Sequence, residues 1–252
     1  LKKYEASGNL IGIAQIKDNI GTLHYYLNDK KRSLKYNLES ITLFQEAGYT
    51  ENTIYSTSLI NLGINYFESG DLKNAEKYFK MSMVINQKIR NQYLLAKNYC
   101  SLGDIDYQLK DYKSSESYHL LSLNLGKQIG NQEVIAYSNG DLGKIYLSKS
   151  LQEKNQKIKN FLNDKSAKFL EKSVAIFKKT QNIQAYQEYL GVLADAYTNQ
   201  GLYKKALEVF KEHSYYKDSL FNTEKLKEFT RKELEFEFSK REDSIKMQND
   251  KK

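Results

Sequence analysis

Histidine and cysteine, the side chains that most often bind metals or transfer protons near neutral pH, are rare in this chain. The three histidines, His24, His119 and His213, are separated by 95 and 94 residues, and none has a second ligand at helical spacing. The single cysteine, Cys100, stands in an apolar helical pattern. We therefore expect structural histidines and a buried, inert thiol, with no metal site, general base or nucleophile.

Glycine-rich phosphate loops are also missing from the sequence. Each of the 13 glycines belongs either to a repeated pattern or to a turn signal. We predict no catalytic residues and no cofactor. The chain is thus predicted not to be an enzyme.

The basic charge is local. The net charge is +8, but the 39 basic residues comprise 35 lysines and only 4 arginines, whereas phosphate and base recognition favours arginine. Residues 144–179 hold ten lysines against Glu153, Asp164 and Glu171. One basic patch is compatible with these numbers, and a nucleic-acid partner is not favoured.

The ends of the sequence suggest a segment of a longer protein. It begins with "LKKYEASGN", has no signal peptide, and has no apolar run near the roughly 20 residues that span a bilayer. We expect any targeting or membrane segment to lie outside it.

Small residues recur along the chain at similar intervals. The stretch "NLGINYFESGDLKNAEKYFKMSM" (61–83) has counterparts around five small anchor residues, spaced by 42, 40, 40 and 51 residues. The anchors are Gly21, Gly63, Gly103, Gly143 and Ala194. In the first, second, third and fifth repeats a second small residue follows the anchor by 12 residues. In the fourth repeat it follows by 23 residues. These second residues are Ser33, Ala75, Ser115, Ser166 and Ala206.

Paired small residues allow two helices to cross closely, so each repeat is predicted to be a helix hairpin. Asp29, Asp71 and Asp111 stand eight residues after an anchor, where an aspartate would cap the second helix. Gly-Asn, Arg-Asn and Gln-Asn pairs are expected where one hairpin ends and the next begins. A single hairpin cannot bury both faces, so the hairpins must stack.

This pattern resembles the tetratricopeptide repeat (TPR) family over about residues 9–214. The best match is Leu62, Gly63, Tyr66, Ala75, Phe79 and Ser82. We predict an all-α, right-handed superhelical solenoid of about eleven helices with a 40-residue period, plus a C-terminal helix. The chain departs from the family in its longer period, in lacking the proline at the repeat end, and in having His24, Asp106 and His119 where aromatic residues are usual.

Two regions are expected from this alignment. Residues 1–214 would form about five hairpins, with an irregular or extended-helix insertion at 148–163 that accounts for the 51-residue spacing. Residues 215–252 would form a charged C-terminal helix or linker.

The resemblance implies that first helices line a concave groove that binds a protein or peptide. Counting from the anchors gives the partner-binding candidates Gln15, Asp18, Tyr25, Tyr26, Thr57, Phe67, Lys97, Asp104, Tyr107, Gln108, Tyr137, Lys144, Asp195 and Asn199. Ile60 and Glu188 share the same offsets.

The tail "YKDSLFNTEKLKEFTRKELEFEFSKRED" resembles the segment that joins TPR arrays to a membrane helix in Bacteroidetes signalling proteins of the histidine kinase or transcriptional regulator type. The resemblance implies the sensor region of a two-component or related system, tethered to a membrane outside this segment and located on its periplasmic side, with a cytoplasmic location as the alternative. A weak homodimer through the tail helix is a further expectation. Two other functions remain open: a soluble peptide receptor or assembly scaffold, and a binder of anionic surfaces or nucleic acid through the 144–179 lysines.

Overall fold

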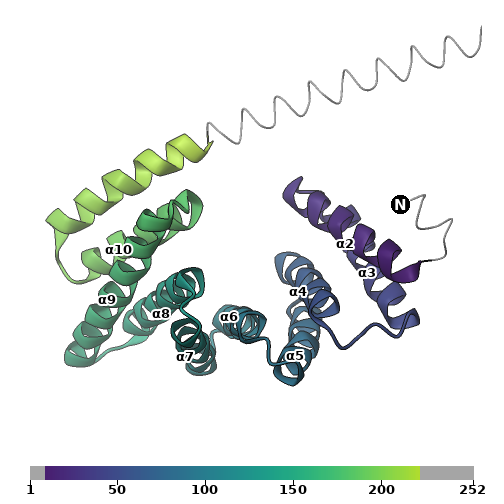
Figure 1. Ribbon diagram of the computed structural model, residues 1–252. Helices are drawn as coiled ribbons and strands as arrows, with labels where there is room; N and C mark the ends of the chain where they lie inside the picture. The colour runs from purple at the N-terminus through teal and green to yellow at the C-terminus, as the bar shows by residue number, and fades with distance from the viewer. Residues whose placement is uncertain (1–8, 222–252) are drawn as a thin grey trace, which may run out of the picture. The chain divides into compact units, whose positions relative to one another are not determined.

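The computed structural model describes residues 9–221, which are almost entirely helical and contain no strand. The helices are α2 (Leu10–Tyr26), α3 (Lys30–Glu46), α4 (Thr53–Glu68), α5 (Leu72–Lys88), α6 (Gln92–Gln108), α7 (Tyr112–Gln128), α8 (Gln132–Gln152), α9 (Gln156–Thr180) and α10 (Ile183–Asn199) (Figure 1). A further helix covers 203–221. The predicted all-α class is confirmed, and the fold is a helical repeat solenoid.

The chain divides into two compact units, residues 1–176 and 177–252, with the boundary inside α9. In the first unit, α2 contacts α3, α4 contacts α5 and α6 contacts α7, as the predicted hairpins require. Each second helix also contacts the first helix of the next hairpin. The first helices α2, α4, α6 and α8 contact one another in succession, whereas the described helices α3, α5 and α7 make no such contacts among themselves. The first helices therefore form one shared surface.

The helix boundaries follow the capping residues expected from the sequence. The side chains of Asp29, Asp71 and Asp111 each accept a hydrogen bond from a backbone N–H of the first turn of α3, α5 and α7. First helices are capped in the same way by asparagine, including Asn91 and Asn131. These predicted boundaries are confirmed.

Left-handed residues end the second helices. Gly48 and Gly130 have φ of 64° and 67°, and Arg90 and Gln181 adopt nearly the same conformation with φ of 55° and 57°. This conformation reverses the chain direction in few residues, and it costs glycine less than other residues. The Gly-Asn, Arg-Asn and Gln-Asn pairs of the sequence therefore mark real hairpin ends.

Close helix crossings depend on the anchors. A Cβ atom added at Gly63 would lie 2.5 Å from the ring of Phe79, and one added at Gly143 would lie 2.5 Å from Leu170. The hydroxyl of Ser166 donates a hydrogen bond of 2.8 Å to the Gly143 carbonyl, across the same crossing. The small residues thus let the two helix backbones approach each other. Phe79, 16 positions after Gly63, packs its ring against the glycine.

Aromatic stacking fills the space beside each crossing. His24 stacks on Tyr36, Tyr66 on Tyr78, and Tyr146 on Phe169, in each case from the first to the second helix of one hairpin. In the third hairpin Asp106 stands at the repeat position that Tyr66 holds in the second hairpin. Tyr118, the counterpart of Tyr78, therefore stacks on Tyr99 of the first helix.

The insertion consists of longer helices. Helices α8 and α9 have 21 and 25 residues, whereas α2, α3, α5, α6 and α7 have 17 residues each. Only residues 153–155 interrupt them. Leu151 is 60% exposed and Phe161 is 57% exposed, so the ends of both helices project from the core. Of the predicted tail, residues 215–221 are helical, and 222–252 lie outside the described residues.

Replacing Ala75 by leucine should destabilise the second hairpin. Ala75 is fully buried against Ile60, Phe79 and Leu102, so a larger side chain overpacks the crossing and is expected to cost about 1–3 kcal/mol of unfolding free energy. Urea denaturation measures the change. The same substitution at Ala175, an exposed position on α9, serves as the control and should leave the midpoint nearly unchanged.

Deleting residues 151–161 should leave the fold nearly intact, because the deletion restores the repeat length near 40 residues and removes mostly exposed side chains. Circular dichroism and the urea midpoint are the measurements. Loss of cooperative unfolding in the shortened chain would show that the insertion belongs to the core.

Candidate functional site

All fourteen candidate partner-binding residues lie on first helices, and twelve of them lie in the first unit. Asp195 and Asn199 lie on α10, in the second unit. Glu188, which shares their offset pattern, lies there too. Because α2, α4, α6 and α8 are in contact, the twelve residues of the first unit lie on neighbouring helices of one surface.

Exposure separates the candidates that a partner can reach from those that pack inside. Tyr26 is 79% exposed, and Lys97 and Gln108 are exposed as well. Thr57 and Phe67 are half-buried, as are Gln15, Tyr25 and Tyr137. The expectation that Ile60 faces the groove is wrong. Its side chain is only 2% exposed and belongs to the hydrophobic core with Phe79 and Leu102. Its offset placed it on the groove, but the packing of α4 against α5 and α6 buries it.

Two candidates, Tyr107 and Asp18, form hydrogen bonds with residues on a neighbouring first helix. The hydroxyls of Tyr107 on α6 and Ser148 on α8 are 2.9 Å apart. The amide of Asn61 on α4 donates a hydrogen bond of 3.1 Å to the carboxylate of Asp18 on α2. These polar contacts fix the spacing between successive hairpins.

Asp18 is a carboxyl group in an unusual environment. Burial raises its pKa from 3.8 to about 6, and the hydrogen bond from Asn61 opposes the shift only in part. Next to Asn61, a cavity of about 70 Å³ lies between the first two hairpins. It is lined by Thr22, Tyr25, Tyr26, Asn37, Asn61, Ile64 and Asn65.

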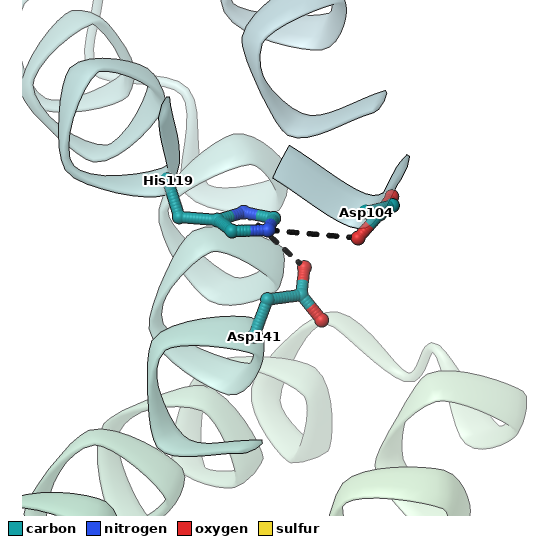
Figure 2. Close-up of side chains that lie close together, drawn as sticks. All are labelled: Asp104, His119 and Asp141. Atoms are coloured by element: carbon teal, nitrogen blue, oxygen red, sulfur yellow. Dashed lines mark ion pairs between the residues drawn. The ribbon is translucent and has the colours of Figure 1, made fainter. Parts of the chain in front are cut away.

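A second polar cluster lies where α6, α7 and α8 meet. His119 projects from α7 toward Asp104 on α6 and Asp141 on α8 (Figure 2). Its Nε2 is 3.6 Å from Asp104 Oδ1, and its Nδ1 is 3.8 Å from Asp141 Oδ2. The other oxygen of Asp141 lies 3.5 Å from Lys144 Nζ. Two candidates of the sequence analysis, Asp104 and Lys144, thus belong to one charged cluster.

His119 is nearly inaccessible to solvent. Its side chain is 1% exposed, and burial lowers its pKa, with the Asp141 carboxylate acting in the opposite direction. It occupies the repeat position of Phe79 and packs against Gly103, where an added Cβ would lie 2.6 Å from Nε2. The imidazole therefore fills an aromatic position in the core while its nitrogens face two carboxylates.

Sequence reasoning missed this cluster because it searched for ligands within one helix. The members come from three helices. Counted from the anchor Gly103, Asp104 is one position and His119 is 16 positions later, and Asp141 stands two positions before the next anchor, Gly143. The same three offsets give Thr22, Asn37 and Asn61 in the first hairpin junction, where all three line the 70 Å³ cavity. Reading the repeats by these offsets would have found the cluster.

The remaining histidines and the cysteine have structural surroundings. His213 donates a hydrogen bond of 2.8 Å from Nδ1 to the Gln187 carbonyl, and His24 stacks on Tyr36. The Cys100 sulfur lies 3.0 Å from the Ser122 hydroxyl, and burial raises its pKa to about 12. The thiol is therefore protonated at neutral pH, as expected for an unreactive cysteine.

The lysine-rich region is partly neutralised within the first unit. Lys149 donates to Glu116, Lys144 pairs with Asp141, and Lys165 lies over the ring of Tyr146 at 4.7 Å. These contacts weaken the case for an anionic-surface or nucleic-acid binder. Across residues 9–221, no helix combines the length with the apolar character that a membrane crossing requires.

Solved structures share this arrangement of hairpins. No protein-family model matches the chain, and no curated protein matches it. BtubC (BKLC) from P. vanneervenii superposes with a TM-score of 0.64 at 15% identity, over 86% of this chain and 84% of that one. A kinesin-light-chain-like protein from Podosopora anserina, with nearly identical TPR-like repeats, gives 0.58 at 14% identity, over 81% and 94%.

The chain has a TPR-like fold. A Rap protein complexed with competence and sporulation factor has the same fold, with a TM-score of 0.56 at 14% identity over 87% of this chain and 67% of that one. At such identities the likeness concerns the fold. The TPR-like hairpin accounts for the anchors, the crossings and the shared surface of first helices described above.

Replacing Asp18 by asparagine should stabilise the chain at neutral pH. The folded state favours the protonated carboxyl, so the contribution of Asp18 to stability is complete below pH 3.8 and is lost as the pH rises through about 6. The upper limit at pH 7 is about 3 kcal/mol. Urea midpoints from pH 4 to pH 8 should therefore diverge between the two proteins above pH 4. Glu46→Gln, at an exposed carboxylate, is the control, and parallel curves for Asp18→Asn and the parent chain would contradict the shifted pKa.

Proposed function

We propose that this chain is a non-catalytic repeat module that binds a protein or peptide segment along the surface of its first helices. The observation that supports the proposal is the contact of α2 with α4, α4 with α6 and α6 with α8, since these four first helices carry twelve of the candidate residues. Tyr26, Lys97 and Gln108 are exposed there. Aromatic and cationic side chains of this kind are typical anchors for an extended or helical segment.

The Rap structure supports the choice of partner class. That protein, of the same fold, was solved in complex with competence and sporulation factor. A protein of this fold can therefore hold such a factor, and the present chain has a comparable arrangement of hairpins.

We further propose that the module is the sensor or regulatory region of a signal-transduction protein. From α2 to α8, each described hairpin contacts only its neighbours, so a ligand that bridges two first helices can favour one arrangement of these hairpins over another. The ligand must bind one arrangement more tightly than the other for any signal to pass. The support for this role is the resemblance of the tail to membrane-proximal segments of signalling proteins. The alternative is a scaffold that binds without changing its own structure.

Replacing Lys97 and Tyr107 together by alanine should weaken partner binding at least tenfold. Peptides selected from a random library on the 252-residue chain provide the probe, and calorimetry measures their affinity. Both residues lie on α6, in the middle of the surface, and losing an aromatic anchor and a charge removes on the order of 2 kcal/mol of binding free energy. Lys77→Ala with Lys113→Ala, two exposed positions on the second helices α5 and α7, is the matched control.

Unchanged affinity of the Lys97 and Tyr107 variant, with wild-type circular dichroism, would assign the peptides to another surface. Hydrogen exchange separates the two roles. For a sensor, peptide binding should alter the protection of residues 203–221, far along the chain from α6. For a scaffold, changes should be confined to the helices that touch the peptide.

A further inference from the structure

We propose that Asp104, His119 and Asp141 form a binding site for a divalent transition-metal ion of the zinc type at the junction of α6, α7 and α8. Metal binding goes beyond the proposed function, although Asp104 is also one of the partner-binding candidates. The sequence analysis predicted no metal site, and the proposal arises from side chains that only the fold brings together (Figure 2).

The distances suit a small metal ion. One imidazole nitrogen and one oxygen from each carboxylate lie within 4.8 Å of one another. Zinc binds nitrogen and oxygen at about 2.0–2.2 Å, so the edges of its tetrahedron are about 3.4 Å long. The two short distances involve different ring nitrogens, 3.6 Å from Nε2 to Asp104 and 3.8 Å from Nδ1 to Asp141. An ion bound to one nitrogen therefore needs the second carboxylate to rotate toward that nitrogen, starting from donor atoms that lie within 4.8 Å of one another.

His119 supplies an independent reason to expect a ligand. Its side chain is 1% exposed, and neither Nδ1 nor Nε2 has a hydrogen-bond partner within the described residues. A buried polar group without a hydrogen bond is costly. Figure 2 shows the ring pointing toward both carboxylates, so an ion held among the three side chains would satisfy one ring nitrogen.

The neighbours of the cluster favour a metal ligand set. Lys144 lies beside one oxygen of Asp141 and leaves the other oxygen facing His119, which orients the carboxylate as outer-shell partners of metal sites do. The Asp104 side chain is 43% exposed, and it provides both a path for the ion and room for water as a fourth ligand. One imidazole and two carboxylates are donors that zinc accepts.

Another junction of the same fold lacks this donor set. The corresponding offsets hold Ile64, Phe79 and Ser101 between the second and third hairpins. Phe79 packs against Gly63 as His119 packs against Gly103. His119→Phe therefore copies an arrangement that the chain already uses, and this variant should fold.

The test uses the full chain freed of metal with a chelator. Zinc titration by calorimetry should show one equivalent bound, and cobalt(II) should give the visible absorption of a tetrahedral site. His119→Phe and Asp104→Asn should each weaken zinc binding more than tenfold. Circular dichroism reports whether each variant is folded.

Two control variants keep the assignment specific. Asp106→Asn removes a carboxylate from α6, the helix that carries Asp104, but leaves the cluster itself unchanged. A double variant with His24→Gln and His213→Gln removes the other two histidines. Both should bind zinc as the parent chain does. Absence of zinc binding to the parent chain would overturn the proposal, and so would binding that survives His119→Phe and disappears in the double variant. The peptide affinities of the preceding section are measured separately in chelator, so failure of either proposal is recognised on its own.

Discussion

The close crossing of the two helices in each hairpin is the constraint on which the rest of the structure depends. At Gly63 there is no space for even a methyl group, because the ring of Phe79 occupies it. Ala75, on the second helix of this hairpin, is fully buried because the two helices lie so close together. These contacts repeat every 40 residues or so in the first hairpins, and the first helices α2, α4, α6 and α8 come into contact in succession.

Constant backbone geometry lets side chains at equivalent offsets differ without altering the fold. The offset after the anchor holds Ile64 in one junction and Asp104 in the next. The position 16 residues after the anchor is Phe79 in the second hairpin and His119 in the third, and each side chain packs against the anchor glycine of its own hairpin. The fold alone therefore does not specify which side chains stand at these positions.

Buried polar contacts link the hairpins in addition to apolar packing. The hydroxyls of Ser56 and Ser82 are 2.9 Å apart, and the Asn86 amide donates to Asn98 at 2.8 Å, which joins α4, α5 and α6. Hydrogen bonds depend on direction, whereas apolar contacts tolerate sliding, so these bonds help to fix the register between hairpins. They also account for the full burial of Ser56, Ser82, Asn86 and Asn98 in a helical core.

The sequence by itself determined the hairpins, because their causes are local or periodic: small residues at crossings, Asp71 and its counterparts as helix caps, and left-handed residues such as Gly130 at the ends. It also placed the partner-binding candidates on first helices. Tertiary structure alone decided which of them a partner can reach, since burial of Ile60 and exposure of Tyr26 depend on neighbouring helices. The cluster around His119 was likewise settled only by the fold, because its three members are 15 and 22 residues apart in sequence and lie within a few ångströms only when three helices pack at one junction.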